Sequence, residues 1–342
     1  MTTPEINEQA LKIKELLKSK SVNIVITSHH NPDGDAIGSV LGLFHLLSNM
    51  GYSAQMVSPN DFPDFLAWLP GSERIVNFYK KKKTASRIIS EADIVFALDY
   101  NGFARLEDME EVVAKSKGKK VLIDHHPNPE STFDVMISDV NVSSTAELVY
   151  EVALALGAEK YICQNTATNI YTGMMTDTGS FSYGCSRPRT FEIVANLIAK
   201  GVAIETAQQQ VYNNFSVDRM KLLGFSLCSK MKVFPEFKSA YISLTRKELK
   251  QFSHKIGDTE GIVNLPLSIK GIVFSAFFVE NKDFIKVSLR SRGNFPVNVV
   301  SQKYYQGGGH KNAAGGKSFF TMEETEANFE QVLNDFKNQL TS

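Results

Sequence analysis

The chain has 342 residues, which exceeds the usual size of one hydrophobic core, so two domains are expected. Its 37 basic and 37 acidic residues cancel, which argues against a protein that binds duplex DNA through a broad positive surface. Three widely spaced cysteines suggest neither a disulfide framework nor a cysteine zinc site, and they suit a reducing, cytoplasmic location. The sequence has no apolar run that could span a membrane, and its amphipathic beginning is unlike a signal peptide.

Residues 1–187 alternate short β-rich runs with helical patterns. This alternation predicts a doubly wound α/β domain whose sheet is mainly parallel. Strands are expected at residues 23–27, 53–57, 93–98, 120–123 and 133–137. Helices are expected between or after them, at residues 36–48, 84–90, 106–114 and 145–156.

Residues 188–229 show consecutive amphipathic helical patterns, which are typical of a helical linker. Residues 230–342 return to β-rich runs and end in a helical pattern, so a smaller α+β domain is expected there. Its strands are expected at residues 240–244, 271–279 and 284–289, and its last helix at residues 322–340. Three glycines and a histidine stand between them at residues 307–310.

Acidic residues and histidines gather where the predicted strands end. The segment SHHNPDGD at 28–35 follows the first strand, Asp99 follows the third, and DHH at 124–126 follows the fourth. A further acidic motif, TDTGS, stands at residues 176–180. In open parallel sheets, ligands bind outside the carboxyl ends of the strands. His29, Asp33, Asp99 and His125 are therefore expected to meet at one edge.

These residue types suit a metal site. Carboxylates and imidazoles without thiolates are ligands for manganese, magnesium or iron, and they exclude thiolate-rich zinc. Asp33 and Asp35 flank a glycine and can point to two adjacent centres, while Asp99 is placed to bridge them and His125 and Asp177 could complete the second. Two metals roughly 3.5–4 Å apart can clamp the oxygens of an in-line phosphoryl displacement.

The same residues also have structural explanations. Asp33 and Asp35 could simply cap the helix that starts near residue 36, and Asp177 could lie in a turn. His30 is not expected to be a ligand, because the following Asn-Pro pair forces extended backbone and neighbouring side chains then diverge. His45 falls on the apolar face of its helix, where a packed histidine is expected.

Taken together, the motifs resemble the DHH phosphoesterases. The first domain contributes SHxxPDGDAxGS at 28–39, Asp99, DHH at 124–126 and TDTGSF at 176–181. The second contributes VSLRS at 287–291 and GGGHKNAAGG at 307–316, which resemble the DHH-associated domain. The resemblance covers nearly the whole chain. The compact form is most similar to the bacterial nanoRNase and phosphoadenosine-phosphate phosphatase branch, and less to the longer RecJ exonucleases.

The resemblance implies roles for individual residues. It implies two divalent ions, with manganese favoured and magnesium or iron also suitable. His126 would then contact the scissile phosphate and protonate a leaving oxygen, which makes it a catalytic residue beside the bridging Asp99. Asp124 could orient a neighbouring histidine or could serve only in a turn. The implied metal ligands are His29, Asp33 and Asp99 for one ion, and Asp35, Asp99, His125 and Asp177 for the other.

The second domain is expected to bind the substrate. Glycines allow close backbone approach and direct amide nitrogens at an anion, and an arginine at a strand end offers a bidentate fork. The alternative is a flexible hairpin loop. The expected substrate contacts are Arg290, Gly307, Gly308, Gly309, His310 and Lys311.

Two positions depart from the family pattern. Gln306 stands where many members have a first glycine, and Ser182 stands near a position where a basic residue is common. Arg187 or Arg189 is expected to supply the missing charge from nearby.

The resemblance and the ligand set lead to a functional expectation. We expect a manganese-dependent phosphoesterase that releases mononucleotides from very short single-stranded RNA and also dephosphorylates 3'-phosphoadenosine 5'-phosphate. The alternatives are a cyclic dinucleotide phosphodiesterase acting on c-di-AMP or its linear product, and a nucleotide-binding protein without activity. A pyrophosphatase is less expected. The family suggests a homodimer, and neither duplex DNA nor a membrane is an expected partner.

Overall fold

The computed structural model describes residues 3–341, and the chain divides into two compact units, Met1–Asn214 and Phe215–Ser342. The boundary falls inside the segment 188–229, for which a linker was predicted. Two helices of that segment, α7 (Pro188–Ala199) and α8 (Ile204–Tyr212), belong to the first unit, whereas α9 (Val217–Phe225) belongs to the second. Each unit has its own buried core.

The first unit contains a six-stranded sheet in the order β3-β2-β1-β4-β5-β6. Every neighbouring pair is parallel, so the predicted doubly wound α/β class is confirmed. The strands are β1 (Ile24–Thr27), β2 (Ala54–Ser58), β3 (Val76–Asn77), β4 (Ile94–Leu98), β5 (Lys119–Asp124) and β6 (Val135–Ser138).

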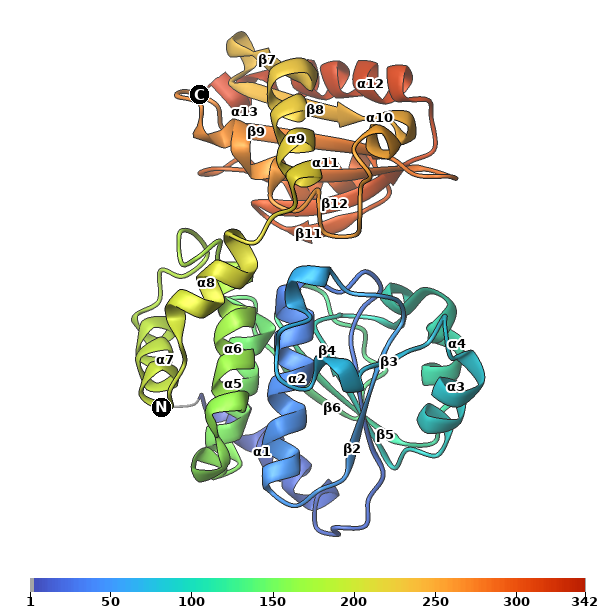
Figure 1. Ribbon diagram of the computed structural model, residues 1–342, viewed down its shortest axis with the longest axis vertical. Helices are drawn as coiled ribbons and strands as arrows, with labels where there is room; N and C mark the ends of the chain where they lie inside the picture. Colours follow the sequence, from blue (N-terminus) through green and yellow to red (C-terminus); the bar gives the residue numbers. More distant parts are fainter. Residues whose placement is uncertain (1–2, 342) are drawn as a thin grey trace. The chain divides into compact units, whose positions relative to one another are not determined.

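Helices cover both faces of this sheet (Figure 1). One face packs against α1 (Pro4–Leu16), α2 (Gly34–Asn49), α5 (Thr145–Ala155) and α6 (Gln164–Asp177). The other packs against α3 (Lys82–Ser90) and α4 (Glu110–Lys115). Strand side chains alternate between the two cores, so Ile24 and Ile26 join the first core while Val25 joins the second.

The connections of the first unit include short 3₁₀ turns. These are η1 (Asp64–Leu66), η2 (Ser72–Arg74), η3 (Phe103–Met109) and η4 (Glu159–Tyr161). The helix expected at 106–114 was wrong in its first half, because η3 occupies that stretch and Glu107 leaves the helical region with φ 50° and ψ −127°. Only the second half forms an α-helix, α4.

The second unit contains a six-stranded sheet in the order β11-β12-β10-β9-β8-β7. All neighbours are antiparallel except β8 and β9, which agrees with the α+β domain expected from the sequence. The strand expected from residue 271 begins only at residue 274, since Gly271 has φ +89° and turns the chain. The strands are β7 (Met231–Phe234), β8 (Ser239–Leu244), β9 (Phe274–Glu280), β10 (Ile285–Ser291), β11 (Gly308–His310) and β12 (Ala313–Ser318).

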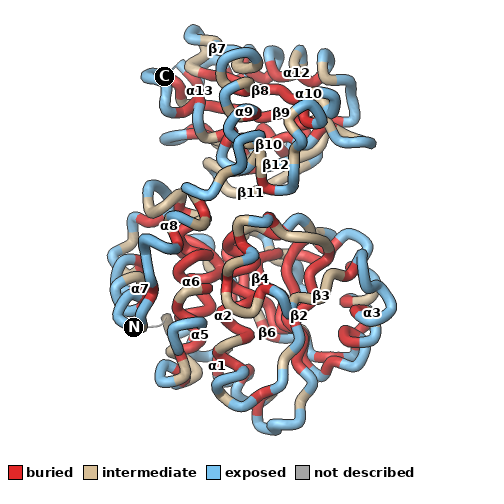
Figure 2. The backbone as a smooth tube through the Cα atoms, in the orientation of Figure 1, coloured by how far each residue is buried: buried red, intermediate tan, exposed pale blue. Residues whose placement is uncertain are grey.

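Two cores flank the second sheet, and its central strands are largely buried (Figure 2). Along β10, Ile285, Val287 and Leu289 face one core, so Arg290 lies on the opposite face. The predicted last helix is interrupted near Phe336. The remaining elements are η5 (Ser226–Lys230), η6 (Pro235–Phe237), α10 (Arg246–Gln251), η7 (Ile262–Ser268), α11 (Val297–Tyr304), α12 (Met322–Asp335) and α13 (Lys337–Thr341).

Among residues 3–341, none of the helices combines the length and the apolar character that crossing a bilayer requires.

Candidate metal centre

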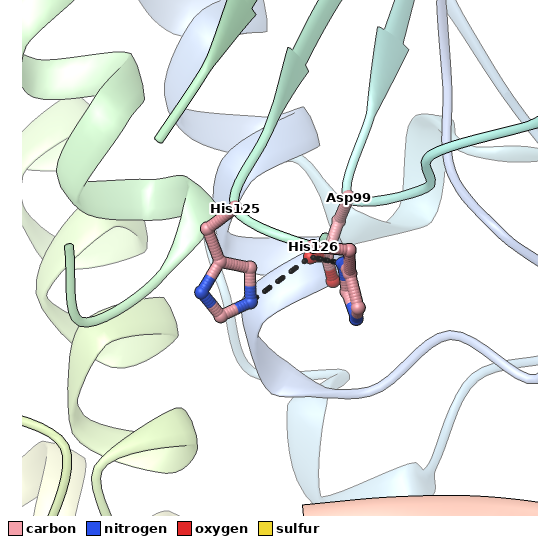
Figure 3. Close-up of side chains that lie close together, drawn as sticks. All are labelled: Asp99, His125 and His126. Atoms are coloured by element: carbon pink, nitrogen blue, oxygen red, sulfur yellow. Dashed lines mark ion pairs between the residues drawn. The ribbon is translucent and has the colours of Figure 1, made fainter. Parts of the chain in front are cut away.

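The carboxyl ends of β1, β4 and β5 are neighbours, and the strand order reverses between β1 and β4. His29 follows β1, Asp99 follows β4, and His125 and His126 follow β5. The structure therefore brings these side chains together at the edge where the sequence placed them, as Figure 3 shows for Asp99, His125 and His126.

Asp99 lies between two of the three histidines of the cluster, His29 and His125. Its Oδ2 atom is 3.4 Å from His29 Nε2, and its Oδ1 atom is 3.7 Å from His125 Nε2. The residue is only 2% exposed. Because the two oxygens face different imidazoles, this carboxylate has the geometry of a bridge.

The first group of converging donors is His29, Asp33 and Asp99. His29 Nε2 lies 4.0 Å from Asp33 Oδ1, while His29 Nδ1 lies 2.9 Å from the carbonyl oxygen of His30. A proton on Nδ1 that is donated to this carbonyl leaves the Nε2 lone pair directed at the carboxylates. Asp33 Oδ1 also accepts the backbone N–H groups of Asp35 and Ala36 at 3.1 Å each. Asp33 is therefore the N-cap of α2, as one alternative proposed, and a member of the cluster as well.

The second group is Asp35, His125 and Asp177. His125 Nε2 is 3.8 Å from Asp35 Oδ2 and 3.6 Å from Asp177 Oδ2. Asp177 is the last residue of α6, so it ends a helix and does not sit in a separate turn.

The start of α5 holds two of these carboxylates in place. The backbone N–H groups of Thr145 and Ala146 donate to Asp35 at 2.7 and 2.8 Å, and the Thr145 hydroxyl donates to Asp99 Oδ1 at 2.9 Å. Sequence reasoning missed Thr145. A threonine directly after a helix N-cap, here Ser144, carries no signal that it will face a site 46 residues away.

His126 faces Asp124 and Asp99. Its Nδ1 atom is 2.8 Å from Asp124 Oδ1 and 3.6 Å from Asp99 Oδ1. Asp124 is fully buried at the end of β5. This contact is the one expected if Asp124 orients the imidazole of His126.

Burial dominates the electrostatics of the cluster. It raises the pKa of Asp35 well above its usual range, with a further contribution from Asp99, and it does the same for Asp99, where Asp33 adds to the effect. Burial also lowers the pKa of His29 to about 4, assisted by the positive charge of Arg105. Buried carboxylates that repel one another next to the neutral imidazole of His29 fit a site whose charge is balanced by divalent cations.

Two glycines let the helices that carry the acidic residues approach each other. A Cβ atom on Gly38 would lie 2.6 Å from the Asn169 carbonyl oxygen, and one on Gly34 would lie 2.3 Å from Thr176 Oγ1. Both glycines belong to α2, and both neighbours belong to α6. This close packing places Asp177 beside the start of α2.

Two of the predicted substrate residues of the second unit, Arg290 and His310, lie on either side of Ala313 in β12. Arg290 on β10 and His310 on β11 both pair with Ala313, from opposite sides. Residues in register across a sheet share a face, so these two side chains are on the same face. Lys311 is exposed and donates to Asn294 Oδ1 at 2.9 Å.

The glycine cluster is shaped by close strand contact. A Cβ atom on Gly307 would lie 1.9 Å from the carbonyl oxygen of Gly315, and Gly309 has φ +134°. Gly308 has open space beside it. Gln306 adopts φ +48°, in the left-handed region that glycine favours, which explains why a glycine is common there.

The arginines expected to supply extra charge are already paired. Arg187 lies 3.9 Å from Asp139 and 3.7 Å from Glu147, and Arg189 lies 2.8 Å from Glu151. Carboxylates lie within 4.0 Å of both guanidinium groups, but within residues 3–341 Arg187 Nη1 forms no hydrogen bond, so the expectation that one of these arginines supplies the missing charge stays a prediction.

The fold and the cluster define an α/β protein with a candidate metal centre at the carboxyl edge of its sheet. Residues 23–174 match the DHH family, N-terminal domain, and residues 245–341 match the DHHA1 domain. The chain belongs to the DHH family.

Similar proteins cover the chain almost completely. The bifunctional oligoribonuclease and PAP phosphatase NrnA of Thermus thermophilus is 28% identical over 99% of this chain and 96% of its own. The NrnA protein of Bacillus subtilis is 28% identical over 91% and 95%. The crystal structure of an exopolyphosphatase-related protein from Bacteroides fragilis covers 100% of both chains at 41% identity, with a TM-score of 0.93.

Proposed function

We propose that this protein is a two-metal phosphoesterase that hydrolyses very short RNA to mononucleotides and 3'-phosphoadenosine 5'-phosphate to AMP. The observation that carries the proposal is the bridging geometry of Asp99, whose two oxygens face His29 and His125. The names of the curated relatives support the choice of substrates.

The metal ligands of the proposal are the first group and the second group, with Asp99 shared between them. His29, Asp33 and Asp99 would hold one ion, and Asp35, Asp99, His125 and Asp177 the other. Manganese is the proposed metal, since oxygen and imidazole donors suit it. Bound divalent ions would supply positive charge to the phosphate oxygens and lower the pKa of an attacking water.

His126 is the proposed general acid. Its Nδ1 atom lies 2.8 Å from Asp124 Oδ1, and this contact orients the ring so that Nε2 is the other nitrogen available to the substrate. In the proposed step, the water oxygen forms a bond to phosphorus while the bond to the leaving ribose oxygen breaks. That oxygen takes the proton from His126 Nε2, and the water loses a proton to solvent.

The second unit is proposed to recognise the substrate. Arg290, His310 and the Gly307–Gly309 backbone carry donors suited to phosphate, and Arg290 and His310 share one face of the sheet. Lys311 adds charge from the adjoining turn. A homodimer and a cytoplasmic location remain part of the proposal.

A substrate panel tests the function. Purified protein with manganese is incubated with RNA of two to five nucleotides, 3'-phosphoadenosine 5'-phosphate and c-di-AMP, and products are identified by mass spectrometry. We expect mononucleotides from the RNA and AMP from the phosphoadenosine. Faster cleavage of c-di-AMP than of RNA would favour the cyclic dinucleotide alternative, and binding without any product would favour a non-catalytic nucleotide-binding protein.

A further inference from the structure

Four loops at the carboxyl edge of the first sheet are tied together beside the metal centre. Asn31, after β1, and Asn60, after β2, make two hydrogen bonds of 2.7 Å each, from the Asn31 backbone N–H to the Asn60 side chain and from the Asn60 amide to the Asn31 side chain. The backbone N–H of Tyr79, after β3, donates to the Pro59 carbonyl at 3.2 Å. The loops after β1 to β4 therefore form one continuous rim. We use "rim" for His30, Asn31, Asn60, Tyr79 and Arg105.

Arg105 is the cation of this rim. It lies in η3 after β4, and its carbonyl oxygen accepts the backbone N–H of His30 at 2.8 Å, which ties η3 to the loop that carries His29. The side chain is half-buried, and within residues 3–341 its guanidinium forms neither a hydrogen bond nor an ion pair. It still acts electrostatically on His29, Asp33 and Asp99. The Arg105 guanidinium therefore lies near the candidate metal centre with no carboxylate paired to it among residues 3–341.

Tyr79 is the aromatic member of the rim. Its ring meets the ring of His30 edge to face, with 6.0 Å between the centroids, and the residue remains 45% exposed. Asp108 and Glu107 of η3 act electrostatically on its hydroxyl, so it lies near the same turn as Arg105. An exposed aromatic ring held by a neighbour in a tied loop can offer a surface for stacking.

We propose that Arg105 and Tyr79 form a nucleotide subsite for single-stranded RNA, in which Arg105 binds a phosphate of the substrate and Tyr79, supported by His30, stacks on a base. The inference rests on the proposed function, since it concerns the same substrate. Proteins that bind single strands without sequence preference combine cationic groups along the backbone with aromatic rings under the bases. The rim provides both on one tied set of loops.

The subsite supplies a positive charge at the edge of the sheet where the sequence lacks an expected basic residue. The basic residue common after the TDTGSF motif is absent here, and the nearby Arg187 and Arg189 are bound to carboxylates. Arg105 offers a guanidinium from another loop at the same edge. A planar guanidinium can bind two phosphate oxygens at once, which a lysine ammonium cannot do in the same geometry.

The test compares four variants with the wild-type protein on a diadenylate RNA. We expect Arg105→Ala to raise KM by about 10-fold or more, with Arg105→Lys recovering only part of the loss. We expect Tyr79→Ala to raise KM by about 5- to 150-fold, the range for one stacked base, and Tyr79→Phe to stay near wild type. Manganese affinity, measured by calorimetry, should not weaken in any of the four, because loss of the Arg105 charge favours a bound cation.

Two diadenylates that lack the base of the first or the second nucleotide isolate the stacking contact. The effect of Tyr79→Ala should vanish on the one that lacks the stacked base and persist on the other. Arg87→Ala is the matched control, because Arg87 is exposed in the last turn of α3, which leads to the amino end of β4. Its KM should equal that of the wild type.

The outcomes separate the subsite from the proposed function. If the wild-type protein cleaves the diadenylate and Arg105→Ala and Tyr79→Ala keep its KM, the subsite is overturned while the function stands. A loss of manganese affinity in Arg105→Ala that accounts for its defect overturns the phosphate-binding role. If the wild-type protein cleaves nothing, the proposed function fails. The subsite is then tested by calorimetry, which measures the affinity of the wild-type protein and the same variants for the diadenylate with calcium present. Equal affinities would overturn the subsite.

Discussion

Asp99 stands in the left-handed region with φ 65°, a conformation that costs an L residue about 1–2 kcal/mol. Its backbone N–H donates to the Ile123 carbonyl at 3.2 Å, and the Thr145 hydroxyl donates to its side chain. These contacts hold the residue in a strained turn directly after β4. This strained backbone conformation directs the Asp99 carboxylate between His29 and His125.

We predict that Asp99→Asn abolishes tight metal binding. The amide keeps the shape of the side chain but loses the negative charge that both donor groups share, so we expect turnover to fall on the order of 100-fold or more. Calorimetry with manganese and steady-state kinetics measure the two effects. Asp93→Asn, at the exposed amino end of the same strand region, is the control and should behave as wild type. Wild-type metal affinity in Asp99→Asn would contradict the bridging role.

We predict that metal binding strengthens as pH rises from about 4 toward neutrality. The raised pKa values of Asp35 and Asp99 mean that the metal-free folded protein holds protons that the unfolded chain has already lost, so these two groups contribute stability that is lost as pH rises, while the lowered pKa of His29 acts in the opposite direction. A metal must displace those protons. His29, with a pKa of about 4, is neutral near pH 7 and releases none. Calorimetry in buffers of different ionisation enthalpy counts the released protons, and none released would refute this account.

At the scale of elements, the start of α5 and the contact between α2 and α6 decide the shape of the centre. The first turn of α5 directs backbone N–H groups at Asp35, an arrangement that helix N-termini favour for carboxylates. The glycines of α2 let its backbone touch α6. Neither feature supplies a candidate metal ligand, yet both fix the positions of the candidate ligands Asp35 and Asp177.

We predict that Thr145→Val weakens metal affinity or turnover by about 10- to 100-fold. Valine keeps the branched shape but cannot donate to Asp99, while the backbone bond to Asp35 survives. Thr145→Ser keeps the hydroxyl and should retain most of the activity. Equal losses in both variants would point to packing at this position instead of the hydrogen bond.

We predict that Gly38→Ala destabilises the first unit by about 1–3 kcal/mol, because the added methyl group would overlap the Asn169 carbonyl and force α2 away from α6. Urea denaturation measures the free energy of unfolding. Gly224→Ala in α9 is the matched control, since a Cβ atom there meets open space and the gain in helix propensity should stabilise by about 0.5–1 kcal/mol. A neutral Gly38→Ala would show that the two helices can separate freely.

At the scale of the whole molecule, the chain consists of two units with separate cores. The proposed metal ligands all belong to the first unit, and the proposed phosphate contacts Arg290 and His310 belong to the second. Trp68, the single tryptophan of the chain, packs against the core of the first unit. Its fluorescence therefore reports on the unit that holds the candidate metal centre.

We predict that manganese stabilises the first unit selectively. At a free concentration of 100 times Kd, the ion adds about 2.7 kcal/mol, which corresponds to roughly 5–10 °C in the Tm of a unit of this size. Thermal scans followed by Trp68 fluorescence should show this shift, whereas the Asp99→Asn variant should show none. A second transition, seen by circular dichroism and unmoved by manganese, is expected for the other unit. A single transition that moves as a whole would mean that the units unfold together.

Sequence alone is enough to predict the doubly wound first domain, the α+β second domain and the residues that gather at strand ends, because periodicity and motif position are local properties. It also identified Asp33 both as a cap and as a candidate ligand, and the structure gives it both positions. The contacts between distant segments are needed to see that the oxygens of Asp99 diverge, that Thr145 donates to one of them, that Arg187 lies beside acidic residues and that Arg105 stands beside the cluster. These facts depend on which distant segments the sheet order and the α2–α6 contact bring together, and spacing along the chain does not encode those distances.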